Sequence, residues 1–185
     1  MSITDIKNRN FQSPLNFEFR IDRLTEFNFF IQKISIPSLS IGTANRPTPL
    51  VNIPQAGDHM AFGDLAIDFK VDEGMNNWYE LFSWMQGISF PERQSQYGDM
   101  IKGQLKDLDG QLSKKNTTRA NGNLYAQGTL MINSSANNPL VAVTFVDLHP
   151  TSLSEVVFDT TTAEIQYATC SVTFKYDYYT VEKVR

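Results

Sequence analysis

The chain has very little of the chemistry that enzymes and metal sites need. Its 185 residues include one cysteine and two histidines. A single cysteine excludes an intrachain disulfide, so a reducing compartment is expected, and we interpret Cys170 as a small core residue. His59 and His149 have no nearby cysteine, and no C-x-x-C or H-x-x-x-H spacing occurs. We therefore predict no metal site and no cofactor.

Catalytic motifs are missing as well. The sequence has no G-x-S-x-G, no phosphate-binding P-loop and no G-x-G-x-x-G. Asp68 and Asp72 share the wet face of one predicted strand, but they lie roughly 13 Å apart at about 3.3 Å per residue, too far for a glycosidase pair. The fragment 107–110 lacks the other ligands of a calcium loop. We predict that the protein is not an enzyme.

Long hydrophobic runs and an excess of basic charge are also absent. The N-terminus has no apolar signal-peptide region, and no stretch approaches the ~18 consecutive apolar residues of a membrane helix. The net charge is −4, which disfavours tight non-specific binding of nucleic acid because such binding requires a basic surface. We expect no signal peptide and no membrane partner. The charge is still compatible with a surface past which nucleic acid slides without adhering.

What the chain does have is β patterning. Residues 168–178 alternate between apolar and polar side chains, which predicts one long strand of roughly 36 Å with a dry and a wet face. Upstream the phase slips near Tyr167, where we expect a bulge or a bend. With 41% hydrophobic residues, the chain can fill the core of one domain spanning residues 1–185.

Further strands are predicted at residues 16–21, 29–36, 65–71, 124–132 and 140–148, the last ended by Pro150. Prolines recur from residue 37 to residue 54, and since proline cannot donate to a β-ladder, residues 36–55 are predicted to form edge strands or an extended arm. A loop is expected at 55–63. Residues 89–123 are predicted to be a long, basic loop insertion.

One short helix is predicted at about residues 77–86. Asn77 is placed to cap it, with Glu80 three residues later. Gly87 is placed to end it. A stripe of apolar side chains is expected to lie on a sheet; its members are Trp78, Leu81, Phe82 and Met85.

The order of these elements resembles the tail-tube proteins of contractile-tailed bacteriophages. The resemblance covers roughly residues 11–180 and rests on the order of the strands, not on one motif. Its most telling segments are 141–153 (VAVTFVDLHPTSL), 156–159 (VVFD), 165–176 (IQYATCSVTFKY) and 65–74 (LAIDFKVDEG). The 89–123 insertion departs from a minimal tube protein. This departure leaves open whether the chain is the main tube subunit or a tube initiator or terminator at one end.

The resemblance implies a mainly β subunit, a β-sandwich or split barrel with one packed helix. It implies that six copies form a ring with a continuous barrel, and that rings stack into a channel for DNA. Sheath and baseplate proteins are the implied partners, and the virion tail, assembled in the host cytoplasm, is the implied location. The residues that would face the lumen are Ala66, Asp68, Lys70, Asp72, Thr169, Ser171, Thr173, Lys175 and Asp177.

A mixed, slightly acidic lumen of this kind would let DNA slide without adhering. The alternative from a different class is a monomeric β-sandwich module that binds carbohydrate, suggested by the tyrosines near the C-terminus.

Overall fold

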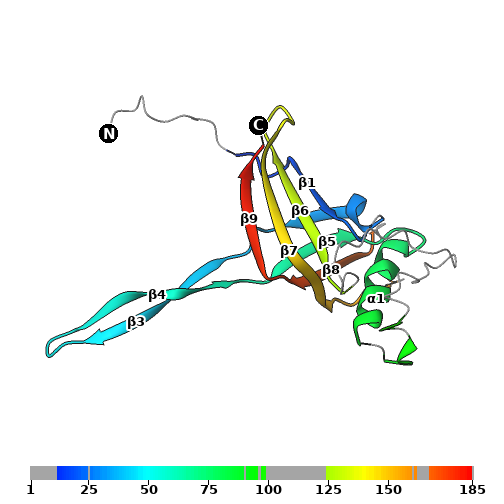
Figure 1. Cartoon of the computed structure of the whole chain (residues 1–185). Coiled ribbons are helices and arrows are strands. Elements are labelled where there is room, and N and C mark those ends of the chain that lie inside the picture. The colour runs from blue at the N-terminus through cyan, green and yellow to red at the C-terminus, as the bar shows by residue number, and fades with distance from the viewer. Residues whose placement is uncertain are drawn as a thin grey trace.

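The structure is a computed structural model that describes residues 12–24, 26–89, 91–95, 97–98, 124–159, 161 and 167–184. In these residues the protein is mainly β with one packed α-helix, which confirms the predicted fold class. Most of the predicted insertion 89–123 lies outside the described residues. Figure 1 shows a sheet-rich body with a hairpin projecting from one side and the helix on the opposite side.

Four antiparallel strands form the part of the body that we call sheet A. In spatial order they are β1 (Phe17–Ile21), β6 (Ala126–Asn133), β7 (Pro139–Leu153) and β9 (Tyr178–Lys183). The alternation predicted for β1 is confirmed, because Phe19 and Ile21 are buried while Glu18 and Arg20 are exposed.

A second group, sheet B, packs across the core from sheet A. It contains β2 (Ile31–Ile34), β5 (Leu65–Lys70), β8 (Thr169–Lys175) and the last residues of β7. The predicted strand at 29–36 is shorter than expected, because Phe29 and Phe30 belong to a 3-10 turn, η2 (Phe27–Phe30). The alternation predicted for 65–71 is confirmed in β5.

Strand β7 belongs to both sheets, so the predicted break at Pro150 is wrong. Its first part pairs with β6 and β9, and from His149 onward it pairs with β8. The strand changes partners next to Asp147, whose φ is 56°. Pro150 is tolerated because the ladder is irregular there, with a register shift between Pro150 and Ser152.

The single long strand predicted at 168–178 is two strands. β8 ends at Lys175 and β9 begins at Tyr178, and the amide of Asp177 between them donates to the carbonyl O of Val146 (3.0 Å). The two strands pair with different parts of β7, so the chain must bend between them. The predicted alternation holds within β8, where Cys170, Val172 and Phe174 are buried. The predicted slip near Tyr167 adjoins residues 162–166, outside the described residues.

Aromatic side chains dominate the core between the two sheets. Phe27 packs edge-on against Phe69 (4.9 Å between ring centroids) and Phe174 (6.4 Å), and Phe19 packs against Phe145 (6.2 Å). The helix adds Trp84, which has no exposed surface. These contacts make the helix and both sheets one packed unit.

The helix α1 (Asn76–Ser89) is longer than predicted and begins differently. Its first turn is held by Asp72, whose Oδ1 accepts a hydrogen bond from the Asn77 amide (3.1 Å). Asn77 is buried and donates instead to the carbonyl O of Lys70 (2.7 Å), which ties the helix to β5. Gly87 does not end the helix, because it is buried within it.

The buried stripe of α1 also differs from the predicted one. Leu81 and Trp84 face the core, whereas Phe82 is 39% exposed. Trp78 is partly buried against the core and stacks on Phe82 at 5.2 Å. Sequence periodicity detected the helix, but two overlapping stripes fit the same pattern.

The hairpin of β3 (Leu39–Pro47) and β4 (Asn52–Phe62) is a separate two-stranded sheet. The loop predicted at 55–63 is wrong, since most of it lies in β4. The strands shift register between Ile41 and Thr43. At this shift Gly57 lies so close to Gly42 that a Cβ on Gly57 would be 2.5 Å from the Gly42 carbonyl O, which requires glycine.

Candidate assembly surfaces

The structure brings together most of the polar side chains predicted to line a channel. In the antiparallel ladder of β5 and β8, Asp68 lies opposite Ser171, and the neighbouring pairs are Ala66 with Thr173 and Lys70 with Thr169. These side chains share one face because residues opposite each other in a sheet point the same way. Lys175 is the last residue of β8 and follows Thr173 on the same alternating side of the strand.

Charges on this face of sheet B are balanced by close partners. Asp68 accepts a hydrogen bond from the Ser171 hydroxyl and lies 3.9 Å from the Lys33 ammonium. The Lys175 ammonium is 3.4 Å from Asp64. Lys70 lies over the ring of Tyr167, 4.8 Å from its centroid. A face with acids and bases interleaved in this way does not concentrate the positive charge that phosphate groups bind.

Two of the predicted channel residues lie elsewhere. Asp72 follows β5 and holds the first turn of α1. Asp177 is exposed in the bend between β8 and β9. Local alternation placed both on the strand face because it does not show where a strand ends.

Sheet A has a second open polar face, which the sequence analysis missed. The cross-strand register places mostly small or polar side chains, together with Met131, on the side away from the core; they are Glu18, Arg20, Thr129, Met131, Ala142, Thr144, Thr180 and Glu182. Only Glu18 and Arg20 are charged near β1, and they form an exposed pair at 3.8 Å. This face depends on the pairing of strands that are far apart in sequence, which alternation alone does not reveal.

Both outer strands of sheet A have an unpaired edge within the described part of the chain. β1 pairs only with β6, and β9 pairs only with β7. Such edges carry rows of free N–H and C=O groups and are ready templates for another strand. They lie at opposite ends of the order β1-β6-β7-β9, so one copy can present β9 to the β1 of the next.

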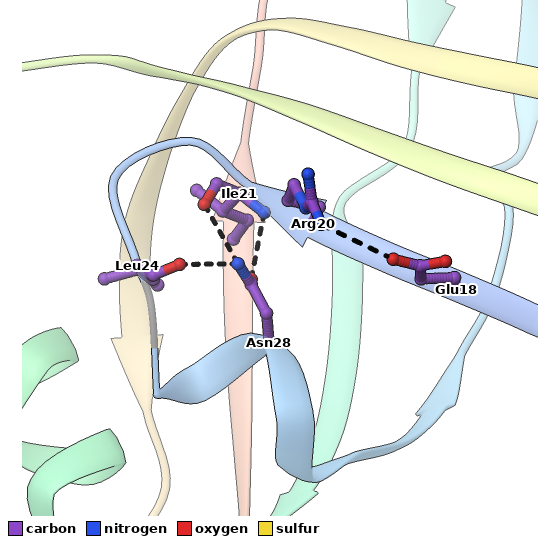
Figure 2. Close-up of polar contacts among 5 residues, drawn as sticks. All are labelled: Glu18, Arg20, Ile21, Leu24 and Asn28. Atoms are coloured by element: carbon purple, nitrogen blue, oxygen red, sulfur yellow. Dashed lines mark hydrogen bonds and ion pairs between the residues drawn. The ribbon is translucent and has the colours of Figure 1, made fainter. Parts of the chain in front are cut away.

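A groove of about 790 Å³ runs beside the open edge of β1. Asn28 is one of the residues that line it, and its side chain points toward the end of β1 and the turn that follows (Figure 2). The Asn28 side chain accepts a hydrogen bond from the Ile21 amide (2.9 Å) and donates to the carbonyl oxygens of Ile21 (3.2 Å) and Leu24. The side-chain amide of Asn28 therefore bonds both backbone groups that Ile21 directs toward the open edge.

The hairpin presents an apolar patch near its root. Ile41 lies opposite Met60 and Leu39 opposite Phe62, so these side chains share a face. Leu39, Ile41 and Met60 are each about half exposed. An exposed cluster of large apolar side chains on a projecting element is typical of a contact surface.

The root of the hairpin is fixed to the body by two tyrosines. Tyr176 donates a hydrogen bond to the carbonyl O of Gly63 (2.8 Å), and Tyr179 donates to the carbonyl O of Pro37 (3.4 Å). The Phe62 ring packs edge-on against both tyrosine rings, at 6.0 Å and 5.5 Å. Burial of the phenol raises the pKa of Tyr176 to about 12, and the nearby Tyr179 and Asp64 add to this effect.

Reactive groups are sparse in the described residues. Burial raises the pKa of the Cys170 thiol, as expected of a residue that packs in the core. Among the residues that the structure describes, no group of three or more His, Cys, Asp and Glu side chains is placed to hold a metal ion. No helix in that part of the chain is long and apolar enough to span a membrane.

Comparisons with known proteins place the chain among tail-tube proteins. It is 24% identical over 160 residues to the tail tube terminator protein of Enterobacteria phage T4, a match that covers 85% of this chain and 79% of that protein. Its fold is similar to the tube-terminating cap of the anti-feeding prophage, with a TM-score of 0.63, 18% identity and 100% of both chains covered.

A second solved structure shares the fold. It contains the sheath/tube terminator of the extracellular contractile injection system PVC, with a TM-score of 0.58 and 16% identity over 90% of this chain and 93% of that one. The family model described as phage tail tube protein matches residues 4–182, nearly the whole sequence. The predicted resemblance is thus confirmed, and the chain belongs to the phage tail tube protein family.

Proposed function

We propose that this protein is a structural subunit of a phage tail tube that closes into a ring at one end of the tube. The observation that carries the ring is the pair of unpaired edges of sheet A, β1 and β9. A contact between two different edges is heterologous, so each added copy leaves the same two edges available, and a fixed rotation closes the series into a ring. The family resemblance suggests six copies.

The position at the tube end is supported by the relative from phage T4. That protein is a tail tube terminator, and the match covers most of both chains. The body of the tube is the second candidate position, because the matching family model is that of tail tube proteins in general. We propose a purely structural role, with sheath or baseplate proteins as neighbours in the virion tail and assembly in the host cytoplasm.

Ring closure through sheet A has a consequence for the channel. Joining β9 to β1 makes sheet A the continuous wall, and its open face then lines one surface of that wall. Joining the strands in this way favours the sheet A face, with Thr129, Thr144 and Thr180, as the lining of a channel for DNA. The sheet B face, with Asp68 and Ser171, is the less favoured candidate. Both faces lack a concentration of basic side chains, so either would let DNA pass without adhering.

Microscopy and sedimentation of the purified protein test the ring and its position. A tube-end protein is expected to form single rings that do not polymerise, and to stop growth when added to polymerising tube subunits of the same phage. Self-assembly into long tubes would instead support the tube body. A protein that stays monomeric at high concentration, above all one that binds glycans, would contradict the proposal.

Labelling of single cysteines distinguishes the two candidate linings. We expect Thr144→Cys in assembled rings to be protected from a bulky maleimide and Ser171→Cys to react faster. The reverse order would assign the channel to sheet B. Unassembled protein, in which both positions lie on open strand faces, serves as the control.

A further inference from the structure

We infer that Asn28 sets the register in which β9 of a second copy pairs with β1. This inference rests on the proposed ring and concerns how its seam is fixed. It begins with the backbone groups that β1 leaves open. The amide of Asp22 donates to the carbonyl O of Gln127, and the amide of Asn133 donates to the carbonyl O of Asn16.

The direction of the open backbone groups follows from those two bonds. The backbone N–H and C=O groups of even-numbered residues in β1 bond to β6. Because the direction of these backbone groups alternates along a strand, those of odd-numbered residues point to the open edge. Among the residues that the structure describes, nothing pairs with the N–H and C=O groups that Phe17 and Phe19 direct to this edge. Ile21 faces the same edge, but the Asn28 side chain already bonds both of its groups (Figure 2).

The open edge of β9 has the same parity. The amide of Val184 donates to the carbonyl O of Leu140, so even-numbered residues of β9 bond to β7. Tyr179, Val181 and Lys183 therefore direct their backbone groups outward. Odd-numbered side chains lie on the core side of both strands, where Phe19 of β1 is buried and Tyr179 of β9 is partly buried, while Val181 and Lys183 are exposed. Antiparallel pairing of β9 with β1 thus satisfies the backbone and keeps both apolar sides in one layer.

Three registers pair at least two outward-facing residues of β9 with those of β1, and Asn28 distinguishes them. When Val181 lies opposite Phe17, Tyr179 lies opposite Phe19, and the residue facing Ile21 is Asp177. Asp177 lies before β9 and already donates its amide to Val146, so its N–H requires no acceptor on Ile21. In the two other registers Tyr179 or Val181 lies opposite Ile21. The outward N–H and C=O groups of that β9 residue would then find the backbone groups of Ile21 already bonded to Asn28.

Charge disfavours one of the two alternatives, whereas in the other, with Val181 facing Ile21, Arg20 would lie opposite Glu182 and only Asn28 opposes the pairing. In the favoured register Glu18 lies opposite Thr180. Shifting the strands so that Lys183 faces Phe17 would place Glu18 opposite Glu182, and like charges directly opposite each other are destabilising. Asn28 and Glu18 thus disfavour the same alternative, and the groove beside β1 is the space in which the incoming strand lies.

Disulfide trapping in assembled rings tests the register. Glu18 and Thr180 would form a non-hydrogen-bonded pair across the seam, with Cα atoms about 4.5 Å apart, which suits a disulfide. The double variant Glu18→Cys with Thr180→Cys is expected to give a ladder of covalent multimers on mild oxidation. Within one copy the two positions are three strands apart, roughly 14 Å, so they cannot bridge internally.

The matched control is Glu18→Cys with Glu182→Cys, which reports the shifted register. We expect at least tenfold less cross-linking from this pair, and a gain of cross-linking when Asn28→Ala is added. The unsubstituted chain, whose Cys170 is buried, is expected to give no ladder. If Asn28→Ala does not fold, the comparison of the two cysteine pairs in the Asn28 background still decides the register.

The outcomes separate this inference from the proposed function. Rings that cross-link mainly through Glu182→Cys, or through neither pair, would overturn the register and leave the ring intact. Rings in which Asn28→Ala changes nothing would overturn the role of Asn28. A protein that never forms rings would overturn the proposed function and this inference together.

Discussion

Some side chains in this protein hydrogen-bond to backbone groups in other elements, and the neighbouring sequence does not predict these bonds. Asn77 has the sequence features of a helix cap, but it links α1 to β5 through Lys70. Asn28 looks like an ordinary turn residue, but it bonds the backbone groups of Ile21 at the end of the open edge of β1. In both cases the partner is a backbone group, so side-chain patterns in the sequence give no signal of it.

Replacing Asn77 with alanine tests the first of these connections. Asn77→Ala leaves the carbonyl O of Lys70 and the amide of Asp72 without their partner in a partly buried position. We expect a loss of about 1–3 kcal/mol in the free energy of unfolding, measured by urea denaturation with an unchanged m-value. Asn76→Ala, which removes a longer contact to Asp72 (3.3 Å), serves as the control with a smaller loss.

Tyr176 makes stability depend on alkaline pH. Its pKa is about 12 in the folded protein, above the value of about 10 for an unfolded tyrosine. Between these values the folded state holds a proton that the unfolded state has released, so this contribution to stability is full below pH 10 and is lost as pH rises toward 12. We expect stability to fall less steeply over that range in Tyr176→Phe.

Absorbance at 295 nm provides an independent measurement for the same residue. The folded protein is expected to show one tyrosine ionising near pH 12, a component that is missing from Tyr176→Phe. An unchanged titration curve in the variant would contradict the assignment.

At the scale of elements, alternation predicted β1, β5 and β8 well because each has one face in the core. It failed where partners change. The closing strand divides at Tyr176 and Asp177 because β8 and β9 pair with different parts of β7, and β7 continues through Pro150 for the same reason. The edges and the groove of the candidate site needed the strand order, which only long-range pairing defines.

The alternation of β8 is testable with two neighbouring residues. Val172 has no exposed surface, so Val172→Asp buries a charge and is expected to abolish folding through a cost of several kcal/mol. Thr173 lies on the polar face opposite Ala66, and Thr173→Asp is expected to remain folded. Circular dichroism during thermal unfolding checks both; similar behaviour of the two variants would show that the faces are assigned wrongly.

At the scale of the whole molecule, the body and the hairpin have different tasks in the proposed assembly. The body closes the ring through β1 and β9, while the hairpin projects from it (Figure 1) and has exposed apolar side chains. The two kinds of contact therefore lie on separate parts of the chain and are separable by mutation.

Substitution of the hairpin patch tests that separation. Ile41→Asn with Met60→Asn removes an opposed apolar pair, and we expect rings to form normally but to bind adjacent rings or tubes at least about tenfold more weakly, since burying one such side chain contributes about 1.5–3 kcal/mol. Co-sedimentation with assembled tubes measures the loss. Thr43→Asn with Ala56→Asn, an exposed pair further along the hairpin, is the control.

The anchored root makes the hairpin a lever. Its longer strand has 11 residues, or about 36 Å at ~3.3 Å per residue, so a rotation of about 5° at the root displaces the tip by roughly 3 Å. Tyr176, Tyr179 and Phe62 fasten that root to the strands that would form the wall. A small tilt of the wall, as when a neighbouring copy docks, would therefore be amplified into a movement of the tip.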